Sequence, residues 1–212
     1  EKYVSLSPYQ YGANNPVNNI DVNGDSVWYT RNGDIVTMHV TAKIFNNSSD
    51  NINMARAAKD IVSDIKSTYE GKFEWSDNKT YNLKVDMDLK VATSMKDVEN
   101  SDHLFVLADS DSKGARGATS MLGGKVMTLA SSDFANNNWL SNNLSYNKTF
   151  TAAHEFGHAI GLSHSQNPFN IMKQGGVVHN SNSNQRVIML QQQNNLNNNL
   201  VVDIYNLGLK WR

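Results

Sequence analysis

Hydrophobic and polar residues alternate near the start of the chain in the pattern of half-buried β-strands. From Val36 to Ile44 every second residue is apolar, and the residues between them are polar. Residues 27–31 form a similar stretch, and the Asn32-Gly33 pair that follows is a strong signal for a tight hairpin. We therefore predict a hairpin of residues 27–31 and 34–45. His39 falls on its polar face, so we interpret it as solvated or hydrogen-bonded rather than as a metal ligand.

A longer alternation covers residues 81–91 and predicts another half-buried strand. Its apolar face comprises Tyr81, Leu83, Val85, Met87, Leu89 and Val91. Asp86 and Asp88 share the polar face, which we interpret as solvated, because no glycine-turned loop of oxygen ligands accompanies them. Residues 103–108 and 125–130 are apolar runs of strand length.

Helical spacing replaces alternation between residues 54 and 69. The recurring apolar residues are Met54, Ala58, Ile61, Val62, Ile65 and Tyr69. Gly71 predicts the end of this helix, which we expect to lie across one face of the sheet. Residues 185–194 predict a closing helix and residues 201–212 a short final strand. These elements together indicate an α+β fold, in one main domain over residues 26–212.

Composition limits the classes of function. The 212 residues are enough for one domain with a substantial core. A formal net charge of -1 gives no electrostatic reason to expect a nucleic-acid or membrane-surface partner. The chain has no cysteine, which excludes disulfides and thiol chemistry, and no apolar run long enough to span a bilayer. It begins at Glu1 rather than methionine, so we expect it to be part of a longer protein, and we expect a monomer.

The densest candidate chemistry lies in residues 154–164. His154 and His158 are four residues apart, so in a helix both imidazoles project from one face and can hold one ion. Glu155 lies one step round the helix, where its carboxylate can take a proton from metal-bound water without being a ligand. Gly161 can adopt a positive φ and turn the chain out of the helix, so that His164 completes the site.

Three histidine ligands with one open position are typical of a catalytic rather than a structural zinc site. Zinc lowers the pKa of its bound water to about 7 and polarises a carbonyl, so peptide hydrolysis is the natural reaction. We expect one catalytic Zn²⁺ and a protein or peptide substrate.

The run from His154 to Ser165 resembles the long zinc signature of the metzincin metallopeptidases, and most of all the matrixin branch. The resemblance implies a metzincin-like mixed twisted sheet, a zinc-binding active-site helix and a small C-terminal subdomain with a methionine turn. Met172 matches that methionine. Some metzincin branches carry a tyrosine ligand directly after it, but this chain has Lys173, so we assign no tyrosine ligand.

The same resemblance suggests where substrate binds. It implies that the strand at residues 125–130 is a sheet edge above the zinc that takes the peptide as an added strand. The residues assigned to this role are Val126, Met127, Thr128 and Leu129. The loop after Met172 lines a specificity pocket in the family, which makes Val177, Val178 and His179 candidates, with His179 equally well a surface residue. The loop from Asp109 to Thr119 contains Asp109 and Asp111 but no histidine, so calcium (Ca²⁺) remains an alternative there and a second zinc is not expected.

Residues 1–25 are rich in turn formers, and on physical grounds they form a loop or linker. They also resemble the closing segment of the Rhs-repeat core, which precedes a variable C-terminal toxin domain. The matching residues are Tyr9, Tyr11, Asn14, Asn15, Pro16, Asp21 and Gly24, whereas Val22 replaces the usual proline and leaves self-cleavage in doubt. This resemblance implies a bacterial toxin that is secreted or delivered to a target cell and has an immunity protein as a partner.

Two other functions remain open at this point. Zinc could staple a binding module, although a structural site would call for a fourth protein ligand. Alternatively, the peptidase could act only on its own chain, near residues 21–26.

Overall fold

The architecture described here is that of a computed structural model, in which residues 27–75, 78–109, 117–135, 145–174 and 181–192 are described. The strands are β1 (Val27–Asn32), β2 (Ile35–Asn46), β3 (Gly71–Glu74), β4 (Thr80–Ala92), β5 (His103–Ala108), β6 (Gly117–Thr119) and β7 (Val126–Ala130). The helices are α1 (Met54–Tyr69), α3 (Ser145–Ala159) and α4 (Ser183–Gln192), with short 3-10 turns η2 (Met95–Asp97) and η3 (Ser131–Asp133). None of the described helices is long and apolar enough to cross a bilayer.

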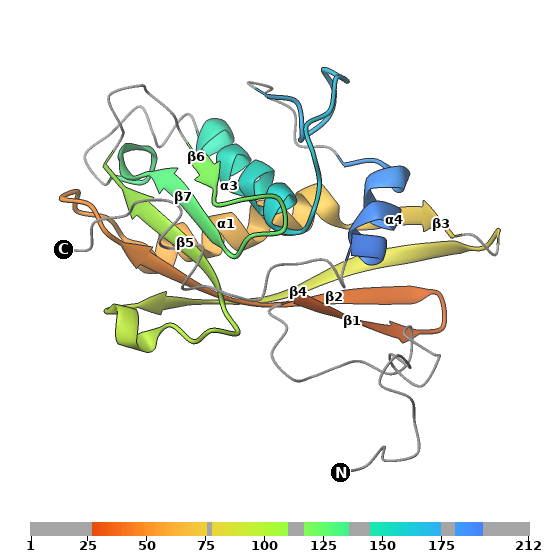
Figure 1. The fold of residues 1–212 in the computed structure, drawn as a ribbon, viewed down its shortest axis with the longest axis horizontal. Helices are drawn as coiled ribbons and strands as arrows, with labels where there is room; N and C mark the ends of the chain where they lie inside the picture. The colour runs from red at the N-terminus through yellow and green to blue at the C-terminus, as the bar shows by residue number, and fades with distance from the viewer. Residues whose placement is uncertain (1–26, 76–77, 110–116, 136–144, 175–180, 193–212) are drawn as a thin grey trace, which may run out of the picture.

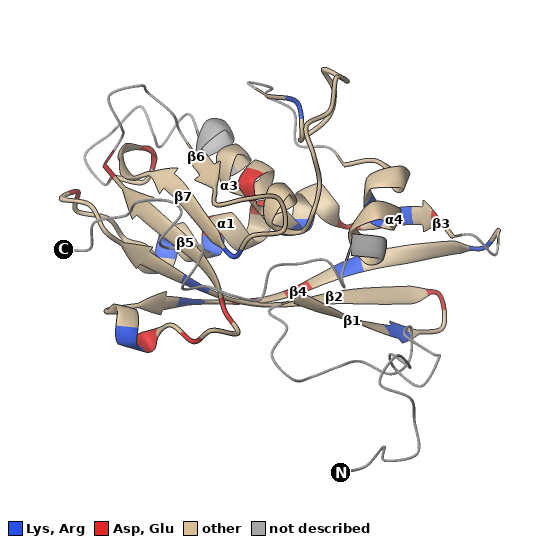
Figure 2. Cartoon of the chain, in the orientation of Figure 1, with Lys and Arg blue, Asp and Glu red and all other residues tan. Residues whose placement is uncertain are grey.

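One mixed sheet organises the domain in the order β3-β4-β2-β5-β7-β6, with β1 paired to β2. Strands β4, β2, β5 and β7 run parallel, and β1, β3 and β6 are antiparallel to their neighbours. The α+β class and the mixed sheet predicted from the sequence are confirmed. Lys and Arg are interspersed with Asp and Glu over the described elements (Figure 2).

The long strand β2 joins the two halves of the sheet. Along one side it pairs with β4, while its other side pairs first with β1 and then with β5. The predicted apolar face, from Val36 to Ile44, is fully buried. Figure 1 shows α1, α3 and α4 on one side of this sheet, and the main core lies between the two layers.

The predicted hairpin and first helix are both present. Asn32 pairs with Ile35, so the turn consists of Gly33 and Asp34, one residue later than predicted, and Gly33 has φ 59. On the polar face, His39 hydrogen-bonds Thr30 and Asp86, as expected for a residue that is not a metal ligand.

Helix α1 begins after Asn53, whose side chain accepts a hydrogen bond from the Arg56 N–H, an N-terminal cap. It ends at Tyr69, two residues before Gly71, as predicted. Because its inner face carries Ile61, Ile65 and Tyr69, all fully buried, it packs on the sheet.

Two short edge strands, β3 and β6, are absent from the predictions. Strand β6 occupies the edge of the sheet beyond β7. The prediction that residues 125–130 form an unpaired edge is therefore wrong, because β7 pairs with β5 on one side and β6 on the other.

Val91 also differs from its predicted burial, with 41% of its surface exposed. Strand β3 pairs with β4 only as far as Leu83, so the later part of β4 has no strand on its outer side among the described residues. A side chain at this position therefore has a neighbouring strand on one side only in the described part of the chain.

Several predicted segments lie outside the described residues. They are the Rhs-like segment 1–25, Asp111 in the loop after β5, the pocket candidates Val177, Val178 and His179, and the final strand 201–212. The closing helix is present as α4, which begins two residues earlier than predicted.

Candidate metal centre

The end of helix α3 has the geometry that brings the third histidine back to the helix. Gly161 has φ 91, in the left-handed region that favours glycine. Its N–H donates to the His158 carbonyl, and the next N–H, of Leu162, donates to the Gly157 carbonyl. This pair of bonds is a Schellman motif, which ends a helix and reverses the chain. The residues that follow therefore run back beside α3.

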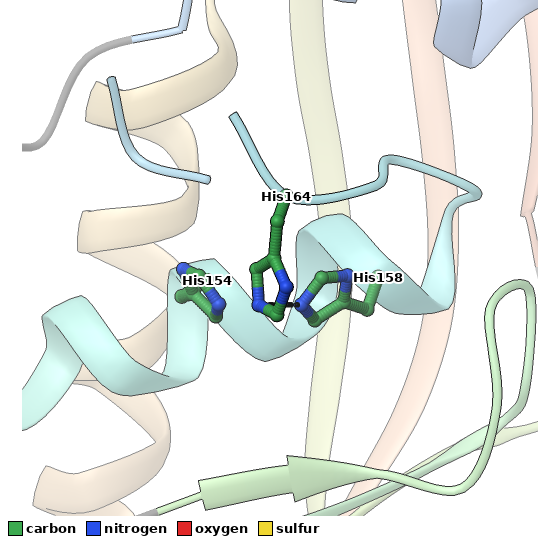
Figure 3. A group of neighbouring side chains, drawn as sticks. All are labelled: His154, His158 and His164. Atoms are coloured by element: carbon green, nitrogen blue, oxygen red, sulfur yellow. Dashed lines mark hydrogen bonds between the residues drawn. The ribbon is translucent and has the colours of Figure 1, made fainter. Parts of the chain in front are cut away.

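Three imidazoles converge on one point beside this helix (Figure 3). His154 and His158 project from α3, and His164 reaches between them from the following loop. One ring nitrogen from each lies within 4.8 Å of the other two. His158 Nε2 and His164 Nε2 are 3.1 Å apart. Two nitrogens bound to one tetrahedral zinc at 2.0–2.1 Å are about 3.3 Å apart, so the spacing of this pair fits zinc.

Backbone carbonyls fix the orientation of the two helical histidines. His154 Nδ1 lies 2.7 Å from the Ile171 carbonyl oxygen, and His158 Nδ1 lies 2.7 Å from that of Leu162. A carbonyl only accepts, so each Nδ1 carries the proton and each Nε2 presents its lone pair to the shared centre. Metal-binding histidines characteristically make this kind of outer hydrogen bond.

The protonation state of these histidines also favours a metal. Burial lowers the pKa of His154, partly offset by the hydrogen bond to Ile171. Burial lowers the pKa of His158 to about 4, with the charges of the other two imidazoles adding to the effect. Neutral imidazole is the form that coordinates metal. At neutral pH both side chains are therefore ready to bind.

Glu155 packs against the edge strand β6. Its Oε2 lies 2.7 Å from the Thr119 hydroxyl, which is also 2.9 Å from its backbone carbonyl oxygen. A Cβ on Gly117 would lie 2.9 Å from Glu155 Cγ, so glycine is required for this close approach. Burial raises the pKa of the Glu155 carboxyl, although the Thr119 hydrogen bond and the charge of His164 act in the opposite direction. A carboxylate with a raised pKa is a better proton acceptor.

The floor of the site is formed by Met172, which is fully buried. A Cβ on Gly157 would lie 2.3 Å from the Met172 sulfur and 2.5 Å from the Tyr69 hydroxyl, so only glycine fits at this point of α3. The Tyr69 hydroxyl donates to the Ala153 carbonyl at 2.7 Å. Residues from α1, α3 and the methionine turn thus meet beneath the histidines.

The structure brings together His154, Glu155, His158 and His164, with Gly161 and Met172 beside them. The four residues predicted to bind substrate in β7 lie one strand away from the edge, and Val126, Met127 and Leu129 are buried. Sequence reasoning did not identify Gly117, Thr119 or Tyr69 as neighbours of the site. No local pattern marks them, because each meets α3 only through the tertiary fold.

The sequence pattern of the family described as matrixin (Peptidase M10) matches residues 28–195. The chain belongs to the matrixin family. This family match agrees with the predicted enzyme class, that of the zinc metallopeptidases. No curated protein matches the sequence.

Solved structures of two other proteins are also similar to this matrixin. Metalloproteinase-II from Bacteroides fragilis is 16% identical with a TM-score of 0.40, and the match covers 71% of this chain and 52% of that one. The chain thus spans about half the length of the Bacteroides protein. Archaemetzincin from Methanopyrus kandleri is 14% identical with a TM-score of 0.38, over 80% of this chain and 97% of that one.

Proposed function

We propose that the chain is a zinc endopeptidase in which His154, His158 and His164 hold one zinc ion and Glu155 transfers the protons. The observation that carries this proposal is the convergence of one ring nitrogen from each of the three imidazoles, with Nδ1 of His154 and of His158 hydrogen-bonded to a backbone carbonyl. When bound, zinc supplies a water of lowered pKa and polarises the substrate carbonyl.

Glu155 performs two proton transfers in this scheme. Its carboxylate takes a proton from the attacking water as the oxygen bonds to the scissile carbon. The same carboxyl then gives a proton to the leaving amine nitrogen as the C–N bond breaks. Burial favours the first step, because it raises the pKa of the carboxyl and so makes the carboxylate a better proton acceptor. Thr119 holds one carboxylate oxygen, which limits the rotation of the side chain.

Strand β6 is the best candidate for the substrate platform. It is the edge of the described sheet on the side of β7, and its inner face already touches α3 through Gly117 and Thr119. An extended peptide can pair with such an edge through its backbone. Met121 and Leu122, just beyond β6, are exposed apolar residues. The Gly123 N–H in the same loop donates to the His158 carbonyl, so this loop lies beside the metal site.

A metal assay paired with the Glu155→Ala variant tests the proposal. We expect about one zinc per chain in both proteins, and cleavage by the variant reduced about 10²–10⁴-fold. Unchanged cleavage in the variant would overturn the role of Glu155. A wild-type chain that binds zinc but cuts no protein would favour the zinc-stapled binding module, and cleavage confined to the chain itself would favour self-processing.

We further propose that the peptidase is the effector of an Rhs-type bacterial toxin, delivered to target cells. The support for this context is the likeness of residues 1–25 to the end of an Rhs core. Producing the chain in a bacterial host, in the cytoplasm or exported, should stop growth, and Glu155→Ala should not. Equal growth with both proteins in both compartments would contradict the toxin role. A neutralising immunity protein would be sought only after toxicity is established.

A further inference from the structure

A pair of buried amides connects helix α4 to the methionine turn. Asn170 and Gln185 are 2% and 8% exposed and bond to each other twice. Asn170 Nδ2 donates to Gln185 Oε1 at 2.7 Å, and Gln185 Nε2 donates to Asn170 Oδ1 at 2.8 Å. Two opposed bonds fix both amide planes, since neither side chain can rotate without losing both.

The start of α4 fixes Gln185 a second time. Its Oε1 accepts the Asn182 N–H at 2.9 Å, and its own N–H donates to Asn182 Oδ1 at 2.9 Å. This reciprocal arrangement is a capping box at the first turn of the helix. The position of Gln185 is therefore set by α4 itself, so that the Gln185 amide presents a fixed surface to the methionine turn.

Asn170 passes this constraint to the metal centre through one peptide group. Its Oδ1 accepts the Met172 N–H at 2.9 Å. That N–H and the Ile171 carbonyl belong to the same planar peptide unit, in which they point in opposite directions. Fixing the N–H therefore fixes the carbonyl, which lies 2.7 Å from His154 Nδ1.

We infer that Gln185 and Asn170 are positioning residues for the metal centre, which orient the Ile171–Met172 peptide so that its carbonyl holds His154 in the metal-binding tautomer. This inference rests on the proposed function, because it treats His154 as a metal ligand. It makes α4 part of the metal site, although no residue of that helix is a ligand.

The attachment of α4 to the rest of the domain does not depend on this amide pair. Arg186 is buried and donates to the carbonyls of Tyr69, Glu70 and Lys72 at 2.9–3.2 Å. The Ser181 hydroxyl donates to the Thr68 carbonyl at 2.6 Å. A chain that loses the amide pair therefore keeps α4 docked on the end of α1. Loss of position at the metal centre is then separable from loss of fold.

The test measures the zinc affinity of the full chain by competition with a chelator, together with its thermal unfolding. Gln185→Met removes the amide at similar length, and Ser181→Ala is a matched control that removes a buried hydrogen bond of the same segment. We expect Gln185→Met to bind zinc roughly tenfold more weakly than the wild type, the smaller end of the loss of affinity seen when a metal ligand loses its outer hydrogen-bond partner. Ser181→Ala should bind zinc as the wild type does. The Co²⁺-loaded Gln185→Met variant should show a changed ligand-field spectrum.

Asn170→Leu removes the acceptor of the Met172 N–H itself and should weaken zinc binding at least as much. Because both residues act through one peptide, the double variant of Asn170→Leu and Gln185→Met should bind zinc no more weakly than Asn170→Leu alone. If Gln185→Met does not fold, Gln185→Glu, which keeps the acceptor but cannot donate to Asn170, takes its place. Equal zinc affinity in the wild type and the folded Gln185 variant would overturn the inference, as would equal weakening in Ser181→Ala. A wild-type chain that binds no zinc would instead overturn the proposed function.

Discussion

Because His103 is buried, we predict that the folded domain loses stability in mild acid. The His103 side chain is 1% exposed and packs on Phe156 of α3. Burial, assisted by the charge of Lys125, lowers the pKa of His103 from 6.5 to about 3. The unfolded chain takes up a proton as the pH falls through 6.5, whereas the folded chain does not until about pH 3. The free energy of unfolding therefore decreases across this interval.

The magnitude follows from the shift of this pKa. Well below pH 6.5 each pH unit lowers the stability by about 1.4 kcal/mol, and the loss summed from pH 7.5 to pH 4.5 is about 2.7 kcal/mol. That is a large part of the roughly 5–15 kcal/mol by which a domain is stable. Replacing His103 with leucine removes the titrating group and keeps an apolar side chain against Phe156.

Urea unfolding of both proteins in a chelator, at intervals from pH 7.5 to pH 4.5, measures the effect. His154 and His158 also have lowered pKa values, but their contribution is common to both proteins and cancels in the difference. We expect the stability of His103→Leu relative to the wild type to rise by about 2.7 kcal/mol as the pH falls from 7.5 to 4.5. A difference that stays constant over this range would refute the reasoning.

Three further outcomes are expected at the metal centre. Gly157→Ala forces a Cβ to within 2.3 Å of the Met172 sulfur. Overpacking of about 1–3 kcal/mol should outweigh the helix-propensity gain of about 1 kcal/mol, so the melting temperature should fall. An unchanged or higher melting temperature would show that the packing around Met172 can relax. Thr119→Val removes the hydrogen bond that lowers the pKa of Glu155, so the acid limb of the kcat/KM profile should move to higher pH. Thr119→Ser should restore the wild-type profile. Identical pH profiles for Thr119→Val and the wild type would show that this hydrogen bond does not set the pKa of Glu155. Removing zinc with a chelator should abolish cleavage and leave the far-UV circular dichroism largely intact, whereas complete unfolding would indicate a structural ion.

The sequence predicts best those parts of the structure whose signal is local. The zinc helix and Gly161 are encoded at fixed spacing within one stretch, and the alternation in β2 gives its buried face directly. The Asn32-Gly33 pair marks the hairpin, but the strand ladder decides which two residues form the turn, and it places Gly33 and Asp34 there. A local dipeptide signal therefore locates a turn only to within a residue.

The parts that sequence reasoning missed depend on contacts between distant segments. Strand β6 has three residues, Gly117–Thr119, too few to show a period, and it exists because β7 offers it a partner. Its presence moves the edge of the sheet away from β7. The Thr119 contact with Glu155 joins residues 36 apart, and the Asn170–Gln185 pair joins an irregular loop to a helix. Neither pair carries a spacing that the sequence alone could reveal.

Arg186 holds α4 against the end of α1, and this contact can form only after α4 has been synthesised. The three histidines are synthesised well before Arg186 and Gln185, so a nascent chain holds every ligand while the methionine turn is still unbraced. Zinc bound before α4 has docked would occupy a site whose His154 is not yet held in position. Full activity would follow only after α4 has left the ribosome. The order of synthesis thus delays assembly of the metal centre until α4 has docked.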